Sequence, residues 1–196
     1  MVWTKLGTTT LGSAGDTISL STFTPSEFNQ IMINLIPSGT AESSLRVGYN
    51  TIDSGSNYAS RFTNNGLSDA TATSNSDITN RDTQDPQLVI AYMSNIATEE
   101  KLYIGFMVGQ STAGAGNAPT RSEYADKWAN TSNQFNKMDV VNGQSGDINT
   151  DSNLTLLGSD GVEVLNVQDG AIYYDTDLNK EYVLYNNTWT EVWKYI

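Results

Sequence analysis

The amino-acid sequence predicts an all-β protein, and three observations support that class. First, apolar residues alternate with polar residues over short segments, which is the pattern of a half-buried strand. Second, Thr, Ser, Asn and Gly are abundant, and charged residues make up only 16% of the chain. Third, long helices require segments rich in Ala, Leu, Glu and Lys, and the composition of this chain does not suit such helices. We therefore expect many short strands joined by turns.

The first third of the chain contains four segments with strand periodicity. They are Asp16–Ser21, Phe28–Ile36, Leu45–Asn50 and Tyr58–Phe62. In the first three, apolar side chains recur at every second position, and the fourth continues with short alternation. One face of each strand is therefore expected to be buried.

A long polar stretch follows, from Asn64 to Asp85. Leu67 and Ile78 are its only large apolar residues, and only they could attach it to a core. Connections of this length are usually functional or mobile. We therefore expect a long loop here.

Two apolar segments in the middle of the chain predict a central hairpin. Leu88–Met93 is apolar on both sides, which predicts a central strand covered on both faces. Glu99 and Glu100 mark a turn, and Leu102–Val108 is the next strand.

The Gly-rich segment Ser111–Pro119 has two readings. It is either a loop that packs against a partner subunit or a wide turn at the rim of the fold. After it, Ser122–Trp128 is a strand or a single helical turn. Gln134–Val141 and Asn153–Leu157 are expected to be the closing strands.

The composition of the C-terminal segment differs from that of the rest of the chain, because it is rich in aromatic residues. We therefore place one domain at residues 1–160 and an aromatic β-hairpin arm or assembly module at 161–196. Two or three short strands are expected, with turns at Asp177–Asn179 and Asn186–Asn187. So few strands are marginal alone, and the aromatic surface needs a cover. The residues expected to bind a partner are Trp3, Tyr173, Tyr174, Trp189, Trp193 and Tyr195.

The residue types present exclude several kinds of active site. The chain has no Cys and no His, which rules out disulfides, Cys/His zinc sites and Ser-His-Asp triads within it. Carboxylates such as Asp53, Glu123 and Asp126 could perform glycosidase-type acid/base chemistry. Nothing in the sequence places two of them together, so scattered surface carboxylates are the favoured interpretation. We expect no enzymatic activity and no cofactor.

Charge and hydropathy limit the classes of partner. The net charge is −12, and the ten basic residues are scattered singly, so nucleic acid is not expected as a partner. No apolar run approaches the length of a membrane span, and no signal-peptide pattern opens the chain. We expect a soluble protein that is made in a reducing cytoplasm, with which the missing cysteine agrees.

Several oxygen-rich or aromatic clusters are candidate ligand sites. Oxygen side chains at alternate positions, as in a calcium loop, occur at Asp175, Asp177, Asn179 and Glu181, with a weaker second cluster at Asp147, Asn149 and Asp151. The glycine and the distant Glu of an EF-hand are missing, and Asx-rich turns give the same letters, so no metal is the favoured interpretation. Trp128, Trp189 and Trp193 could stack on sugars, although a core or interface role is favoured.

Four segments together resemble a family of virion-associated proteins encoded with the structural genes of tailed phages. They are W-T-K-L-G-T-T-T-L-G-S-A-G-D-T-I at Trp3–Ile18, N-Y-A-S-R-F-T-N-N-G at Asn57–Gly66, S-T-A-G-A-G-N-A-P-T-R at Ser111–Arg121 and K-W-A-N-T-S-N-Q at Lys127–Gln134. The tail at Asp169–Trp189, with I-Y-Y-x-T-D-x-N-K and a later N-x-x-W, is similar to short β modules of phage tail and adhesin proteins.

This resemblance implies a jelly-roll-like antiparallel β-sandwich with the small C-terminal β-hairpin extension. It also implies a structural role in the virion, as a capsid decoration or tail accessory protein that binds other virion subunits. We expect a homo-oligomer, and a trimer before other oligomers. It is expected to dock through the N-terminal strand or the aromatic tail. The alternative is a receptor-binding module for host-surface polysaccharide, and a carboxylate-based depolymerase is a third hypothesis. The resemblance carries no catalytic residues.

Overall fold

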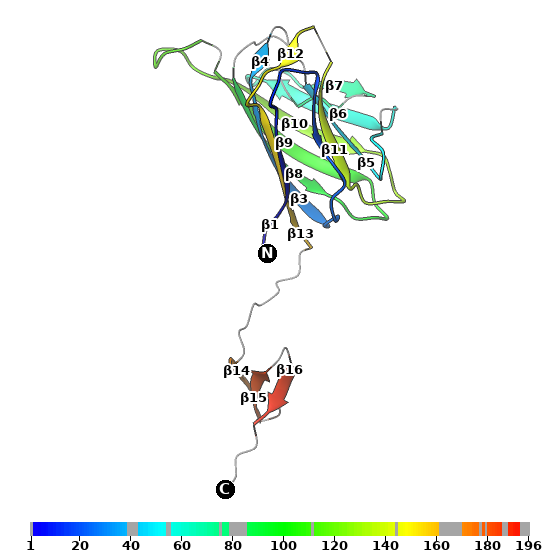
Figure 1. The fold of residues 1–196 in the computed structure, drawn as a ribbon, viewed down its shortest axis with the longest axis vertical. Coiled ribbons are helices and arrows are strands. Elements are labelled where there is room, and N and C mark those ends of the chain that lie inside the picture. The colour runs from blue at the N-terminus through cyan, green and yellow to red at the C-terminus, as the bar shows by residue number, and fades with distance from the viewer. Residues whose placement is uncertain are drawn as a thin grey trace. The chain divides into compact units, whose positions relative to one another are not determined.

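The computed structural model describes residues 2–38, 43–53, 56–74, 76–78, 86–110, 112–143, 145–160, 170–176, 178, 180–185 and 188–192. These residues form strands and turns and contain no helix, so the all-β class is confirmed (Figure 1). Within the same residues there is accordingly no helix capable of spanning a membrane. The chain divides into two compact units, residues 1–162 and 163–196, two residues from the boundary that the sequence predicts.

Unit 1 contains three antiparallel sheets. The largest has eight strands in the order β1 (Thr4–Thr10), β13 (Asn153–Ser159), β3 (Phe28–Leu35), β8 (Gln87–Ser94), β9 (Lys101–Gly109), β10 (Thr120–Trp128), β6 (Tyr58–Asn64) and β7 (Ala70–Thr73). The second has the order β2 (Thr17–Leu20), β11 (Lys137–Asn142) and β5 (Ser43–Gly48), and the third pairs β12 (Asp147–Ile148) with β4 (Pro37–Ser38).

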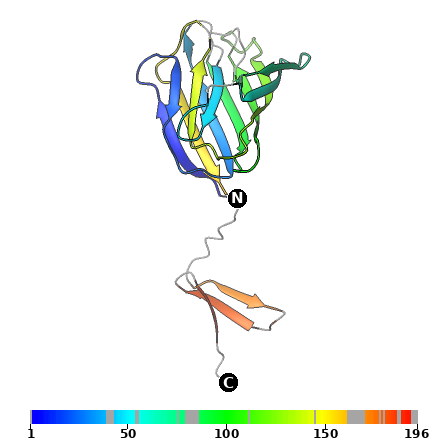
Figure 2. The same cartoon turned by 90° about the vertical axis from the view of Figure 1, so that its right-hand side faces the viewer.

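The core lies between the eight-stranded sheet and the β2–β11–β5 sheet, which form two layers (Figures 1 and 2). Most strands of the two sheets contribute alternate residues to it, because side chains on a strand point to opposite faces in turn. Ile31 and Val89 come from the large sheet, and Ile18, Leu45 and Val140 come from the small one. This is a β-sandwich-like arrangement, and its finer description as a jelly roll remains a prediction.

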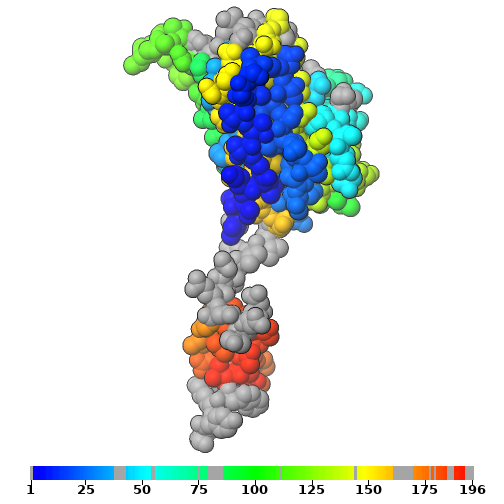
Figure 3. Space-filling view, in the orientation of Figure 1, coloured from blue at the N-terminus to red at the C-terminus, as the bar shows by residue number. Residues whose placement is uncertain are grey.

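One edge of the sandwich is closed by a contact between sheets. Strands β1 and β2 belong to different sheets but run side by side along the surface of unit 1 (Figure 3). The Thr9 hydroxyl donates a hydrogen bond of 2.7 Å to the Ser19 carbonyl. The first strands of the two layers are thereby joined.

Most of the predicted strands are confirmed. The segments that begin at Asp16, Phe28, Leu45 and Tyr58 overlap β2, β3, β5 and β6, and Ser122–Trp128 is a strand rather than a helical turn. The predicted central hairpin is also confirmed, since β8 and β9 are neighbours in the middle of the large sheet. Sequence analysis gave no bounds for the N-terminal strand β1, and it missed β4, β7 and β12, which are short or carry few large apolar side chains.

The prediction of one continuous loop over Asn64–Asp85 is wrong. It contains β7, which pairs with β6. Ile78 is buried, as predicted, and its N–H donates to the Ser43 carbonyl at 3.0 Å. Leu67 is 72% exposed and attaches nothing. Residues 79–85 lie outside the described part of the chain.

The prediction that Leu88–Met93 is covered on both faces is also wrong. Val89, Ala91 and Met93 are buried in the core, whereas Leu88 and Tyr92 are 50% and 47% exposed on the other face. The small sheet covers only the inner face of the large one, and no second layer of described residues lies over the outer face. The segment is apolar on both sides, but the described residues cover only its inner face.

Unit 2 is a three-stranded antiparallel sheet. Its strands are β14 (Ile172–Asp175), β15 (Lys180–Tyr185) and β16 (Thr188–Glu191), in that order. Leu184 is its buried apolar residue among those described. Because the core cluster of unit 1 contains no residue of unit 2, each unit has its own apolar interior.

Deleting residues Val162–Ile196 is expected to leave unit 1 folded, because the truncation removes no member of its core. The far-ultraviolet circular dichroism spectrum should stay that of a β-protein, and the melting temperature should change by no more than a few degrees. A truncated protein without a cooperative thermal transition would show instead that the tail belongs to the core.

Candidate binding surfaces

A continuous apolar surface lies on the outer face of the large sheet. Six of its side chains are between 47% and 57% exposed: Leu88 and Tyr92 from β8, and Leu102, Ile104, Phe106 and Val108 from β9. We call this set the outer apolar face. Single exposed apolar residues are ordinary, but a contiguous patch on a monomer marks an interaction site.

Strand register makes these side chains direct neighbours across the two strands. Alternate residues of a strand share one face of the sheet, and directly opposed residues of adjacent strands are the closest neighbours on that face. The opposed outward pairs across β8 and β9 are Leu88 with Val108, Ile90 with Phe106, and Tyr92 with Ile104. The apolar stripe is therefore two strands wide and runs along the middle of the sheet.

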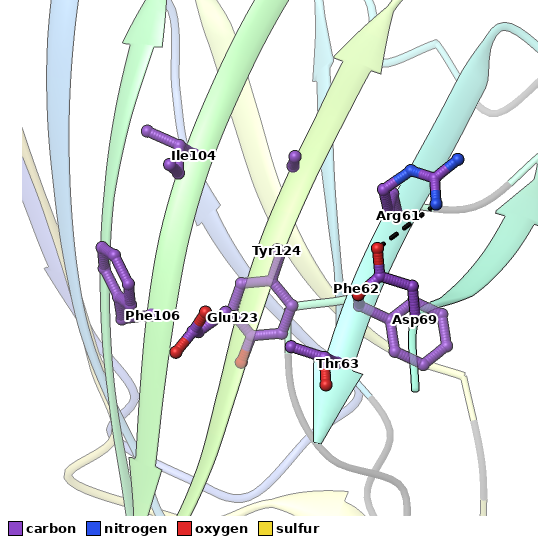
Figure 4. Close-up of a pocket in the computed structure, with 9 residues that line it drawn as sticks. Arg61, Phe62, Thr63, Asp69, Ile104, Phe106, Glu123 and Tyr124 are labelled. Carbon is purple, nitrogen blue, oxygen red and sulfur yellow. Dashed lines mark hydrogen bonds and ion pairs between the residues drawn. The ribbon is translucent and has the colours of Figure 1, made fainter. Parts of the chain in front are cut away.

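A groove runs beside this stripe, over β10 and β6. One hollow of about 420 Å³ is lined by Leu102, Ala59 and Lys127 among others, and a second of about 200 Å³ is lined by Ile104 and Phe106. Both hollows include Ala125 and Arg61, so they form one groove, which we call the β10 groove. Its floor is low because Ala125 and Ala59 are small. Figure 4 shows Ile104 and Phe106 on one side and the Arg61–Asp69 pair on the other.

Paired charges border the same surface. The three ion pairs are Arg121 with Glu123 at 3.1 Å, Lys127 with Glu100 at 2.7 Å, and Arg61 with Asp69 at 3.3 Å. All six side chains are substantially exposed, so these pairs contribute little to stability. Three positive and three negative charges sum to zero, whereas the whole chain carries −12. Among the described residues, these ion pairs add no net charge to the border of the outer apolar face.

Trp3, one of the residues predicted to bind a partner, contacts the outer apolar face. Its ring centroid lies 6.4 Å from that of Tyr92, with the planes tilted by 58°. The Tyr92 hydroxyl in turn accepts a hydrogen bond of 3.3 Å from the Gln30 side chain. The segment before β1 therefore extends the apolar surface rather than standing apart from it.

A buried lysine holds the turn between β8 and β9. The Lys101 ammonium donates to the carbonyls of Ala97, Glu99 and Asn130 at 3.2, 2.6 and 2.8 Å, and it lies 5.8 Å from the Trp128 ring centroid. Burial lowers the pKa of this amine, which the nearby Glu99 opposes. Carbonyl oxygens and an aromatic face replace the water that a cation loses on burial. The strands that carry the outer apolar face thus have a fixed end.

The inner face of β10 carries a buried carboxyl group that sequence analysis did not assign to the core. Asp126 accepts a hydrogen bond of 3.3 Å from the Ser76 hydroxyl and is only 4% exposed. Burial raises the pKa of Asp126 to about 7; the nearby hydroxyls of Tyr103, Ser60 and Ser76 lower it, and Asp77 raises it further. The expectation of a surface carboxylate is therefore wrong for Asp126. Its neighbours Tyr124 and Trp128, two residues away on either side, share its face of the strand and were the sequence signal that this face is buried.

The carboxylates considered for acid/base chemistry are not brought together as a pair. Asp126 faces the core, whereas Glu123 is on the outer face of the same strand and pairs with Arg121. The Asp53 carboxylate accepts hydrogen bonds from the Trp128 indole at 2.9 Å and from Asn57 at 2.8 Å. Trp128 itself is buried, so the core interpretation is right and the ring is closed to sugars.

Unit 2 presents an aromatic hollow. Tyr173 lies directly opposite Tyr182, with ring centroids 6.1 Å apart and nearly parallel planes. The Trp189 ring meets Tyr173 edge-on at 6.0 Å. These three rings and Asp175 line a hollow of about 370 Å³, and Tyr173 and Trp189 are 51% and 44% exposed. Tyr174, 50% exposed, is on the opposite face of the sheet because it is the next residue along β14.

The calcium-like cluster is only partly visible. Asp177 and Asn179 lie outside the described residues, as do Trp193 and Tyr195 among the predicted partner-binding residues. Glu181 lies opposite Tyr174, so it is on the other face of the sheet from Asp175. The Asp175 carboxylate accepts a hydrogen bond of 2.9 Å from the Leu178 N–H, three residues further along the turn after β14. No cluster of three or more potential metal ligands occurs among the described residues.

Comparison with known proteins identifies no relative: no family model, no curated protein and no solved structure matches the chain.

Replacing the buried Asp126 by Asn should remove a pH dependence of stability. The folded state has a pKa near 7, against 3.8 for a free aspartate, so it binds more protons than the unfolded state between these values. The free energy of unfolding of the wild type should therefore fall as pH rises from 4 to 7, by up to about 4 kcal/mol.

Urea unfolding at several pH values measures this slope. Asp126→Asn should flatten it and be more stable than the wild type at pH 8. Glu123→Gln, on the outer face of the same strand, is the matched control and should keep the wild-type slope. Parallel slopes for wild type and Asp126→Asn would show that this carboxyl group is not the cause.

Proposed function

We propose that this chain is a non-enzymatic structural subunit of a tailed-phage particle, a capsid decoration or tail accessory protein that binds other virion subunits. The observation that carries the proposal is the outer apolar face. Two central strands expose six large apolar side chains in one contiguous patch, which a free-standing monomer would leave in water. A surface of this kind fits a protein whose working state is an assembly.

Two further features support the proposal. The segments that resemble phage virion-associated proteins include Trp3–Ile18 and Lys127–Gln134, and Trp3 contacts the outer apolar face. Unit 2 adds a second exposed aromatic surface, so one chain carries two separate places for partners. Repetition of such contacts over a symmetric particle gives avidity without high affinity at each contact.

Labelling of intact particles tests this function. Gold-labelled antibodies against the full chain should decorate purified particles from a lysate of the host at regular positions, on the capsid lattice or at the tail. Antibodies pre-absorbed with the chain are the control. A chain that is abundant in the lysate but absent from purified particles would contradict the proposal.

A second candidate function, recognition of host-surface polysaccharide, is favoured by the aromatic hollow of unit 2. Aromatic rings offer an apolar face to a sugar ring, and a carboxylate beside them can accept hydrogen bonds from sugar hydroxyls. The hollow combines three rings with Asp175 and is large enough for a sugar ring. This function is compatible with a place in the virion.

A glycan array separates the two functions. If unit 2 binds polysaccharide, Tyr173→Ala should abolish the signal, because it removes the ring in contact with both other aromatic side chains. Tyr174→Ala, equally exposed on the opposite face, should keep it. A wild-type protein that binds no glycan on the array would leave unit 2 as a protein-binding module only.

A further inference from the structure

We infer that the outer apolar face binds a second copy of this chain, face to face, with the β9 ridge of one copy seated in the β10 groove of the other. The β9 ridge is formed by Leu102, Ile104 and Phe106. This inference rests on the proposed function, which requires a protein partner, and it names that partner and the surface that holds it.

The first argument is shape. The β9 ridge and the β10 groove are adjacent strips of one sheet face, since Ile104 lies opposite Ala125 across the β9–β10 ladder. Large side chains stand on one strip, and the small Ala125 and Ala59 form the floor of the next. A surface with a ridge beside a groove complements a second copy of itself, because a two-fold axis between the strips places each ridge in the opposite groove.

The second argument is charge. Two chains of net charge −12 repel each other, so a contact between copies must lie where the local charge is close to zero. In the described part of the chain, the three ion pairs at the border of the outer apolar face meet this condition, with three positive and three negative side chains. An acidic or a basic partner would gain nothing from such a balanced border. Paired charges of both signs can exchange partners with the same pairs on a second copy.

The third argument is area. Large side chains that are half exposed present on the order of 100 Å² each, so six supply roughly 600 Å², against about 800 Å² per partner in a standard interface. The walls of the β10 groove, including Arg61 and Lys127, supply additional contact area. The surface is therefore sufficient for a specific contact between two copies.

The position of the surface agrees with this use. The outer apolar face occupies the fourth and fifth strands of eight, far from the sheet edges formed by β1 and β7. Lys101 binds two carbonyls of the β8–β9 turn and one of the segment after β10. The partner thus meets a rigid surface, which limits the ordering cost of association.

Sedimentation equilibrium of the full chain tests the inference. The wild type should be a two-fold dimer at micromolar concentration, because a reciprocal contact of this kind closes at two copies. Phe106→Lys should raise the dissociation constant by about a hundredfold or more, because it places a charge at the centre of the contact. Tyr49→Lys is the matched control, since Tyr49 is equally exposed at 48% but follows β5 of the other sheet. It should leave the dissociation constant unchanged.

A second variant acts on the groove and leaves the ridge intact. Ala125→Arg should fill the floor of the β10 groove and also dissociate the oligomer, whereas Ala115→Arg in the exposed β9–β10 loop should not. Both ridge and groove positions face outward, and circular dichroism should show all four variants folded. Reversing one ion pair with Arg121→Glu together with Glu123→Arg should preserve association better than Arg121→Glu alone.

The outcomes separate this inference from the proposed function. A wild-type chain that stays monomeric at all concentrations, or an oligomer unaffected by both Phe106→Lys and Ala125→Arg, overturns the contact between copies at this face. Particle labelling would still decide the virion role in either case. An oligomer sensitive to both substitutions supports the contact even if the chain is absent from particles.

Discussion

The structure depends on one constraint: an eight-stranded sheet has two faces, and the described chain covers only one of them. The β2–β11–β5 sheet packs on the inner face and encloses the core, with residues such as Ile31, Val89 and Val140 fully buried. The outer face keeps an apolar stripe along β8 and β9. Burial of apolar area is the dominant favourable term in folding and in association. The burial of apolar area, which stabilises the fold of unit 1, can therefore also favour association at its outer face.

Polar residues inside unit 1 support this one-sided design. Lys101 and Trp128 fix the end of the β8–β9 hairpin, and the Trp128 indole is bonded to Asp53. On the inner face of β10, Asp126 and its surrounding hydroxyls sit between the layers at a cost in desolvation. Each buried polar group demands defined partners, which makes the packing more specific than an all-apolar core would be. The outer surface is consequently presented by a sheet with little freedom to move.

The class of fold could be predicted from alternation alone, because the segments around Ile31 and Leu45 repeat apolar residues with the period of a strand. The missed strands, such as β7 with its A-T-A-T sequence, bury little and carry no such signal. The apolar residues of the stripe were identified from the sequence, but their outer face was predicted to be buried within the chain. A strand apolar on both sides reads the same whether its second face meets another layer of its own chain or a partner. The roles of Lys101 and Asp126 depend on contacts between distant segments, which local patterns do not encode.

The proposed function is one of assembly, in which unit 1 would supply its outer apolar face and unit 2 its aromatic hollow. Its central claim is that the outer apolar face is covered in the native protein. Hydroxyl-radical oxidation of the full chain, read by mass spectrometry, tests this through two tyrosines of matched exposure in the single chain: Tyr92 on the outer apolar face at 47%, and Tyr49 at 48%. The account predicts that Tyr92 is oxidised several times more slowly than Tyr49. Equal rates at high protein concentration would contradict it.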